Sequence, residues 1–196
     1  MLFAQYAPWE NYPKKLRHTE VVNPLVVITD FFSTDLLGGH YKKLKKWRHY
    51  VLKDKVYKDK RHGPGSLLFT YDMNVKLIEA AYLLHYNDRA AKNEKVIVSA
   101  IELEVERKLW DDFPKNLSHK EIHDPYQAFG KVFRKISLPQ YRDYLHEWLY
   151  AALYSKGGNN ELKADEIKLV YKNLLKLYSA AWLIYQRENK VSVKNL

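Results

Sequence analysis

The chain lacks several features, and each absence narrows its possible functions. It contains no cysteine, which excludes disulfide bridges and thiolate metal sites and fits a reducing compartment. Its few glycines form neither a phosphate-binding loop nor a dinucleotide-binding fingerprint. No apolar run approaches the roughly 18 residues of a membrane-spanning helix, and residues 1–6 lack the basic and apolar regions of a signal peptide. We therefore expect a soluble, cytoplasmic protein without a cofactor.

The chain does contain an internal repeat, which is sought first because it decides the architecture. A shift of 101 residues superimposes Trp47 on Trp148, and beyond the next loop a shift of 100 superimposes Ala80-Ala81 on Ala180-Ala181. The matches have helical spacing, which favours a repeated helical unit over two ordinary segments that share amphipathic patterning. Further matching pairs are Asn23-Pro24 with Asp124-Pro125, Phe32 with Phe133, Leu44 with Leu145 and Tyr71 with Tyr171.

We predict an all-α protein, a tandem duplication of a three-helix unit with a bridging helix between the copies. In the first copy, Asn23-Pro24 starts a helix, because asparagine caps helices well and proline suits the first helical turn. Gly38-Gly39 is expected to end this helix, and two more are expected from about residue 40 to 54 and from about residue 66 to 87. A tryptophan buried in each copy should pack the unit, with its indole N–H hydrogen-bonded.

The predicted boundaries divide the chain into five parts. A stretch of roughly 15 residues or more without a turn signal favours a helix between the copies, over about 91–112. The N-terminal residues contain prolines and no apolar periodicity, which predicts an extended arm. The parts are an extended N-terminal arm over 1–22, helical unit 1 over 23–90, a bridging helix and loop over 91–120, helical unit 2 over 121–189 and a frayed tail over 190–196.

The net charge of the chain is +10, and most of it lies in one segment. Residues 41–61 contain ten basic and two acidic residues, a net charge of +8. In the matching segment of the second copy the charges of Arg142, Asp143, Glu147 and Lys156 cancel. Cations concentrated on one helix and its following loop are typical of a surface that binds polyanions. The candidate nucleic-acid-binding residues are Lys42, Lys43, Lys45, Lys46, Arg48, His49, Lys53, Lys55, Lys58, Lys60 and Arg61.

Spacing within this segment favours contact with a nucleic-acid backbone. Basic side chains along one helical face with aromatic rings between them suit phosphates and stacked bases. Lysine outnumbers arginine, which favours charge contact over the reading of base edges. The stripe is Lys42, Lys46, His49 and Lys53, and the interleaved rings are Tyr41, Tyr50 and Tyr57.

The leading hypothesis is a non-enzymatic helical module that binds DNA or RNA, largely without sequence specificity. A lysine-rich helix is also a common solvated surface, so the alternative is an interaction or regulatory adaptor. Its partner would be an acidic protein or a second copy of the chain.

Two histidines could form part of a metal site. His119 and His123 have the spacing that places two imidazoles on one helical face. No third or fourth ligand can be named from the sequence, and the residues on either side resemble helix boundaries. We therefore predict no metal site.

The segment Arg142-Asp143-Tyr144-Leu145-His146 is similar to the Arg-to-His motif of HEPN-type ribonucleases, which are small all-helical proteins. The resemblance implies a third hypothesis, a helical ribonuclease that uses Arg142 and His146. The chain departs from the family pattern, which places more residues between the arginine and the histidine than the three found here. A surface pair one helical turn apart explains the same spacing, so we predict no catalytic residue.

Overall fold

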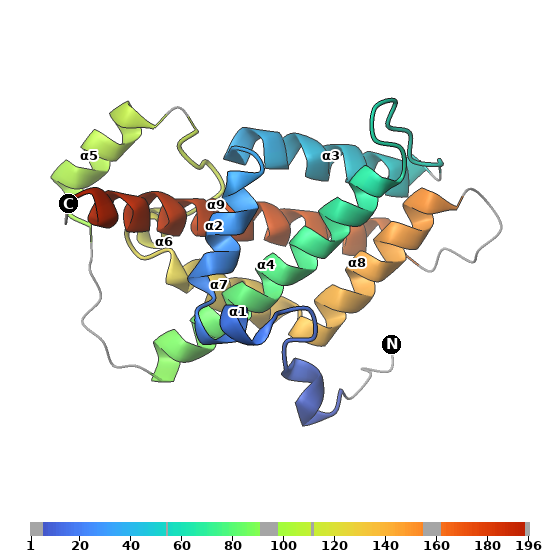
Figure 1. Ribbon diagram of the computed structural model, residues 1–196, viewed down its shortest axis with the longest axis horizontal. Helices are drawn as coiled ribbons and strands as arrows, with labels where there is room; N and C mark the ends of the chain where they lie inside the picture. Colours follow the sequence, from blue (N-terminus) through green and yellow to red (C-terminus); the bar gives the residue numbers. More distant parts are fainter. Residues whose placement is uncertain (1–5, 54, 91–97, 111, 155–161, 195–196) are drawn as a thin grey trace.

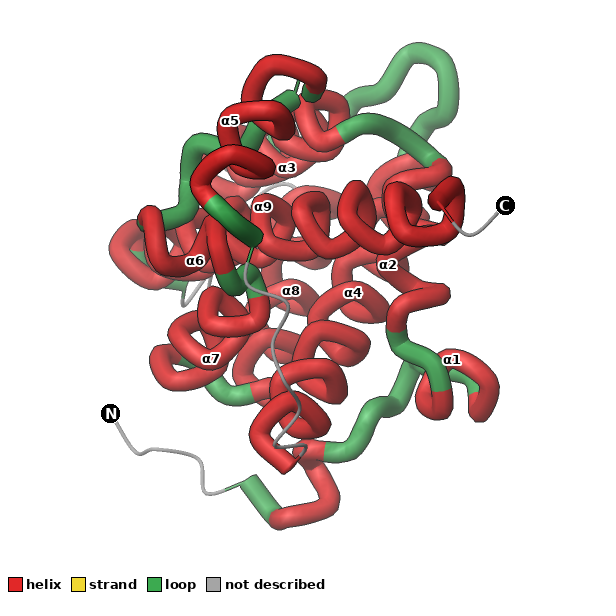
Figure 2. The backbone as a smooth tube through the Cα atoms, turned by 90° about the vertical axis from the view of Figure 1, so that its left-hand side faces the viewer, coloured by secondary structure: helices red, strands yellow, loops and turns green. Residues whose placement is uncertain are grey.

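The structure, a computed structural model, describes residues 6–53, 55–90, 98–110, 112–154 and 162–194. All regular secondary structure in these residues is helical, which confirms the predicted all-α class (Figure 1 and Figure 2). None of the helices that they form is long and apolar enough to cross a lipid bilayer. The elements are η1 (Pro8–Asn11), α1 (His18–Val22), α2 (Leu25–Ser33), α3 (Leu37–Lys53), α4 (Gly65–Ala90), α5 (Ala100–Leu109), α6 (His119–His123), α7 (Tyr126–Lys135), α8 (Leu138–Leu153) and α9 (Ala164–Lys194).

The long helices interleave around one core. α4 packs against α2, α7 and α8, whereas α9 packs against α2, α3 and α7. α3 and α8 contact each other, and α4 and α8 run side by side (Figure 1). The core therefore contains side chains from α2, α3, α4, α7, α8 and α9. A smaller cluster of Val98, Leu103, Ile122 and Leu183 attaches α5 and α6 to α9.

The predicted burial of Trp47 in α3 is confirmed. Leu37, His40, Leu44, Trp47 and Val51 are buried, and they recur at helical spacing. This stripe faces α8 and α9, and the lysines of α3 face solvent or the pocket towards α4.

The prediction that Gly38-Gly39 ends a helix is wrong, because both glycines lie in the first turn of α3. Two carboxylates approach this turn. The Gly38 N–H donates to Asp112 (N–Oδ2 3.0 Å), and a Cβ atom on Gly39 would lie 2.0 Å from Asp35 Oδ1. The glycines therefore make room for carboxylates beside the positive end of the helix dipole.

The N-terminal arm predicted over residues 1–22 is not uniformly extended, because it contains η1 and α1. α1 is too short to show apolar periodicity, and a buried carboxylate holds it. Glu20 accepts the main-chain N–H of Arg17 and pairs with Lys76 of α4 (Nζ–Oε1 2.9 Å). Glu121 acts in the same way for α6, where it accepts the Ser118 N–H and pairs with Lys176 of α9 (2.7 Å).

Two further boundaries differ from the prediction. α5 occupies only Ala100–Leu109 of the predicted bridging helix, because Ser99 caps it and Trp110 leaves the helical conformation. Residues 91–97 of that prediction lie outside the described residues. At the C-terminus, a frayed tail was expected from residue 190, but α9 continues to Lys194 through most of it.

Candidate functional site

The predicted basic segment forms α3 and the loop that follows it. On α3, Lys42, Lys45, His49 and Lys53 are exposed on the side away from the core. The side chains of Lys55, Lys58, Lys60 and Arg61 are exposed in the loop. We call these eight residues the outer basic face. Within the described part of the chain, no carboxylate forms a salt bridge with any of their basic side chains.

The other three predicted binding residues have intramolecular contacts. Lys43 pairs with Asp35 (Nζ–Oδ2 2.9 Å), and Lys46 pairs with Asp59 (Nζ–Oδ2 3.2 Å). The Arg48 guanidinium lies over the ring of Tyr171, 4.0 Å from its centroid. The structure therefore separates the eleven candidates into an outer face and three cations already engaged by neighbouring side chains.

The three tyrosines predicted to interleave with the lysines do not lie beside them as free rings. Tyr41 hydrogen-bonds Ser179 of α9 (O–O 2.6 Å), and Tyr50 packs on Tyr57 (centroids 5.1 Å apart). All three are partly buried against the core. Tyr41 and Tyr50 lie on flanks of α3 that contact other elements, and Tyr57 lies in the loop after α3, so none of the three is a fully exposed ring.

Exposed rings lie instead on α8 and at its C-terminal end. The His146 ring is tilted against Tyr150, with centroids 4.6 Å apart, and Tyr150 stacks on Tyr154, with centroids 5.6 Å apart. The loop after α3 lies beside this end of α8, because the Tyr57 N–H donates to the carbonyl oxygen of Ala152 (2.7 Å). The i, i+4, i+8 spacing of His146, Tyr150 and Tyr154 is visible in the sequence. The packing that brings these rings near the basic loop is not.

Asp59 organises that loop. Its carboxylate accepts the main-chain N–H groups of Arg61 and His62, each at 3.0 Å, and the ammonium of Lys46. These interactions hold the pKa of the Asp59 carboxyl well below its usual range. Gly63 completes the turn with a φ of 58°, a conformation that glycine adopts without strain.

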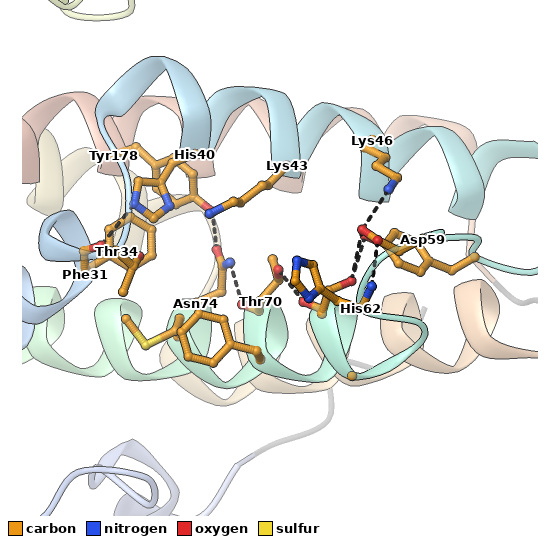
Figure 3. A pocket seen from close by; sticks show the side chains of 15 residues that line it. Phe31, Thr34, His40, Lys43, Lys46, Asp59, His62, Thr70, Asn74 and Tyr178 are labelled. Atoms are coloured by element: carbon orange, nitrogen blue, oxygen red, sulfur yellow. Dashed lines mark hydrogen bonds and ion pairs between the residues drawn. The ribbon is translucent and has the colours of Figure 1, made fainter.

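A pocket of about 530 Å³ lies between α3 and α4. Figure 3 shows Lys43 and Lys46 on the α3 side, Thr70 and Asn74 on the α4 side, and Asp59 and His62 at one end. Phe31, His40 and Tyr178 close the other end, where the His40 ring stacks on Phe31 with centroids 3.9 Å apart. The pocket was not predicted from the sequence, because its walls come from α2, α3, α4, α9 and the loop after α3.

The pocket wall contains a buried histidine and a buried tyrosine–asparagine pair. His40 Nε2 lies 3.0 Å from the carbonyl oxygen of Phe31. Burial and the nearby Lys43 lower the pKa of His40 to about 4, so its ring is neutral at pH 7. The Tyr178 hydroxyl donates to the Asn74 side chain, whose amide donates to the carbonyl oxygen of Thr70. These contacts fix the polar groups of the wall.

His119 and His123 are brought together, as their spacing predicted. Their Nε2 atoms are 3.4 Å apart, and His123 Nδ1 lies 2.7 Å from the carbonyl oxygen of Val98. Among the described residues, no group of three or more His, Cys, Asp or Glu side chains is arranged to hold a metal ion. His123 therefore meets the main chain through Nδ1 and faces His119 through Nε2.

Arg142 and His146 have separate environments. The Arg142 guanidinium pairs with the fully buried Glu79 (Nη1–Oε1 3.0 Å) and donates to the carbonyl oxygens of Tyr12 and Glu10. His146 is exposed against Tyr150. These contacts give Arg142 a structural role, which is to hold the N-terminal segment on α4 and α8.

The comparisons add no relative. The chain matches no protein-family model, no curated protein and no solved structure.

Proposed function

We propose that this protein is a non-enzymatic binding module whose outer basic face engages nucleic acid without sequence specificity. The observation that carries the proposal is the separation of cations on α3. Lys43, Lys46 and Arg48 are engaged within the protein, whereas no carboxylate of the described residues pairs with the basic side chains of the outer basic face. Exposed lysines on one helix and one adjoining loop suit phosphates, because each contact releases condensed counterions.

The rings of α8 extend this proposal to single strands. Tyr150 and Tyr154 are exposed at the end of α8 that the basic loop contacts through Ala152. Bases of a single strand can stack on such rings, which contribute roughly 1–3 kcal/mol per base. Paired bases of a duplex cannot, so single-stranded DNA or RNA is the preferred ligand under this proposal.

We also propose that the chain arose by tandem duplication and that only the first copy acquired the cations. The corresponding pairs Glu20–Lys76 and Glu121–Lys176 support the duplication. The carbonyl contact from His40 to Phe31 also has a counterpart, from Tyr141 to Val132. At the aligned exposed positions the first copy has Lys45, His49 and Lys53, whereas the second has His146, Tyr150 and Tyr154. A shared scaffold does not require this difference in charge.

Fluorescence anisotropy with labelled oligonucleotides of about 20 residues tests the proposal. Single-stranded DNA, single-stranded RNA and duplex DNA are titrated at several salt concentrations. A variant with Lys42, Lys45 and Lys53 changed to Glu should bind at least tenfold more weakly, and its salt slope should fall by about two to three. A variant with Lys120, Lys135 and Lys168 changed to Glu has the same net charge, and its affinity should fall no more than threefold.

The results of this titration distinguish the contribution of the α8 rings from that of the outer basic face. Loss of single-strand binding in Tyr150→Ala and Tyr154→Ala, with duplex binding unchanged, would support the stacking role of α8. No binding at low salt, or equal losses in the two lysine variants, would contradict the proposal, because general charge attraction would then explain the affinity.

A homodimer is the second candidate, and the exposed face of α5 favours it. Ile101, Val105 and Leu109 lie one turn apart and are 79%, 47% and 68% exposed. Aligned apolar side chains on one helix are typical of a helix–helix interface, and a two-fold axis would bring two such faces together. Light scattering should give a dimer mass that Val105→Glu reduces to the monomer mass. A monomer at all concentrations would exclude this candidate.

A further inference from the structure

The pocket between α3 and α4 follows from how these helices pack. They are consecutive in the chain, but α3 packs on α8 and α9, whereas α4 packs on α2, α7 and α8. A gap between them is left open, and Phe31 of α2 and Tyr178 of α9 close one end of it. The gap is wide enough for a ligand, since small-molecule sites commonly measure roughly 300–1,000 Å³.

The corresponding positions in the second half of the chain carry less polar side chains. Under the alignment of the proposed duplication, α8 and α9 stand where α3 and α4 stand. Tyr141 replaces His40, Val170 replaces Thr70 and Leu174 replaces Asn74, and all three replacements are fully buried in the core. Ile78, which is also buried, replaces Tyr178. The helix arrangement therefore does not by itself require these polar residues.

The polar hollow has an energetic cost that a packed wall does not. A cavity lowers stability in proportion to its volume, and buried polar groups must each be hydrogen-bonded. The first half of the chain keeps both features, with Asn74 and Tyr178 bonded to each other at the pocket wall. A retained cavity with fixed polar groups is the usual form of a ligand site.

The residues of the wall define the ligand. Aromatic rings and Met73 provide flat apolar surfaces, and the Phe69 ring is 53% exposed beside the opening. The charged groups of the wall are Lys43, Lys46 and Asp59, and Lys43 also pairs with Asp35, which lies outside the wall (Nζ–Oδ2 2.9 Å). The two ammonium groups favour an anionic group on the ligand. The rings Phe31, His40, Tyr57, Phe69 and Tyr178 favour a planar aromatic body over an aliphatic chain.

We propose that this pocket binds a small organic anion with a planar aromatic body of one or two rings and a single anionic group. The rings lie against Phe69 and Met73, and the carboxylate, sulfonate or phosphate lies at Lys43 and Lys46. This site is independent of the outer basic face, because it uses the lysines that face α4.

Fluorescence titration of the full chain with 8-anilinonaphthalene-1-sulfonate, an aromatic monoanion, tests the site. Neighbouring residues provide matched controls. Phe69 lines the pocket, whereas Leu68 is similarly exposed (45%) and does not line it. Lys43 lines it, whereas Lys42 belongs to the outer basic face. Phe69→Ala and Lys43→Gln should raise the dissociation constant at least fivefold, and Leu68→Ala and Lys42→Gln less than twofold.

Displacement of the bound probe defines the chemistry. 1-Naphthoate should displace it, whereas the neutral 1-naphthalenemethanol and the aliphatic decanoate should be at least tenfold weaker. Displacement by adenosine 5′-monophosphate would identify a nucleotide as the source of the aromatic anion, and displacement by naphthoate alone would identify an aromatic acid. Both outcomes support the site.

Other results would overturn the proposal. These are the absence of saturable one-to-one binding, equal losses in the pocket variants and their controls, or equal displacement by the neutral alcohol or decanoate. Circular dichroism of each variant verifies that it is folded. Phe69→Ala and Lys43→Gln leave the outer basic face unchanged, and Lys42→Gln, which changes it, is only a control. A failure to bind nucleic acid would therefore not affect the result of this test.

Discussion

The indole N–H of Trp47 donates to the main-chain carbonyl oxygen of Trp148 (3.1 Å), and the two rings meet edge to face with centroids 5.6 Å apart. Both side chains are fully buried. The relationship is not reciprocal, because the indole N–H of Trp148 is buried without an acceptor among the described residues. The expectation of a hydrogen-bonded indole is therefore confirmed for Trp47 and wrong for Trp148.

This asymmetry predicts different costs for the same substitution. Trp47→Phe removes ring contacts and a hydrogen bond, whereas Trp148→Phe removes ring contacts and an unpaired N–H. We expect Trp47→Phe to lower the free energy of unfolding by about 1 kcal/mol more than Trp148→Phe. Urea unfolding followed by far-UV circular dichroism measures the difference. Equal losses would show that the hydrogen bond contributes nothing net.

Glu79 and Arg142 should hold the N-terminal segment in place. Glu79 is fully buried and accepts the main-chain N–H groups of Lys14 and Lys15 as well as the Arg142 guanidinium. Glu79→Ala leaves these donors without their acceptor, so we expect a loss of about 3–5 kcal/mol. Trypsin should also cleave after Lys14 and Lys15 more rapidly than in the parent protein.

The exposed pair of Glu104 and Arg107, 3.8 Å apart, is the control for this prediction. Glu104→Ala should change the stability by less than about 0.5 kcal/mol, because surface ion pairs contribute little. Unchanged trypsin cleavage in Glu79→Ala would show that other contacts fix the segment.

Acid should destabilise the fold in two stages. Burial and Lys43 lower the pKa of His40 from 6.5 to about 4. Burial alone would raise the pKa of Glu20 and Glu121, but their hydrogen bonds lower it from 4.5 to about 2. The His40 contribution is complete above about pH 6.5 and is lost towards pH 4. The glutamate contributions are complete above about pH 4.5 and are lost towards pH 2.

Urea midpoints measured from pH 7 to pH 2 test this order. His40→Phe should remove most of the pH dependence between 6.5 and 4, and the double variant Glu20→Gln, Glu121→Gln should remove much of it between 4.5 and 2. A parent protein whose stability does not change over these windows would exclude both assignments.

Gly39→Ala should destabilise the start of α3. The added Cβ would collide with the Asp35 carboxylate, which accepts the Leu36 N–H and pairs with Lys43. We expect a cost of about 1–3 kcal/mol. In the background of Asp35→Ala the same change should become neutral or stabilising, because alanine has the higher helix propensity.

Gly65→Ala is the control, since a Cβ atom there meets nothing within 4 Å. It should be neutral or slightly stabilising. Thermal unfolding of the single and double variants gives the coupling between positions 35 and 39. Additive effects would contradict a clash between Asp35 and the new methyl group.

The sequence by itself determined the helices and helix starts that depend on residues close together in the chain. Apolar residues at helical spacing indicated α2, α3, α4 and α7 to α9, and the prolines at Pro24 and Pro125 marked two helix starts, since α2 begins at Leu25 and α7 at Tyr126. The buried stripe through Leu44 and Trp47 was visible for the same reason. Periodicity, capping and burial of one face are set by neighbouring residues, so they can be predicted without a structure.

Only the tertiary structure decided which cations are paired within the protein. Lysine surrounds much of α3, so spacing grouped Lys46 with Lys42, although Lys46 turns to Asp59 in the next loop. The pairing of Glu79 with Arg142 and the pocket between α3 and α4 also join residues far apart in the chain. Such contacts depend on how the helices cross, and local spacing carries no information about that geometry.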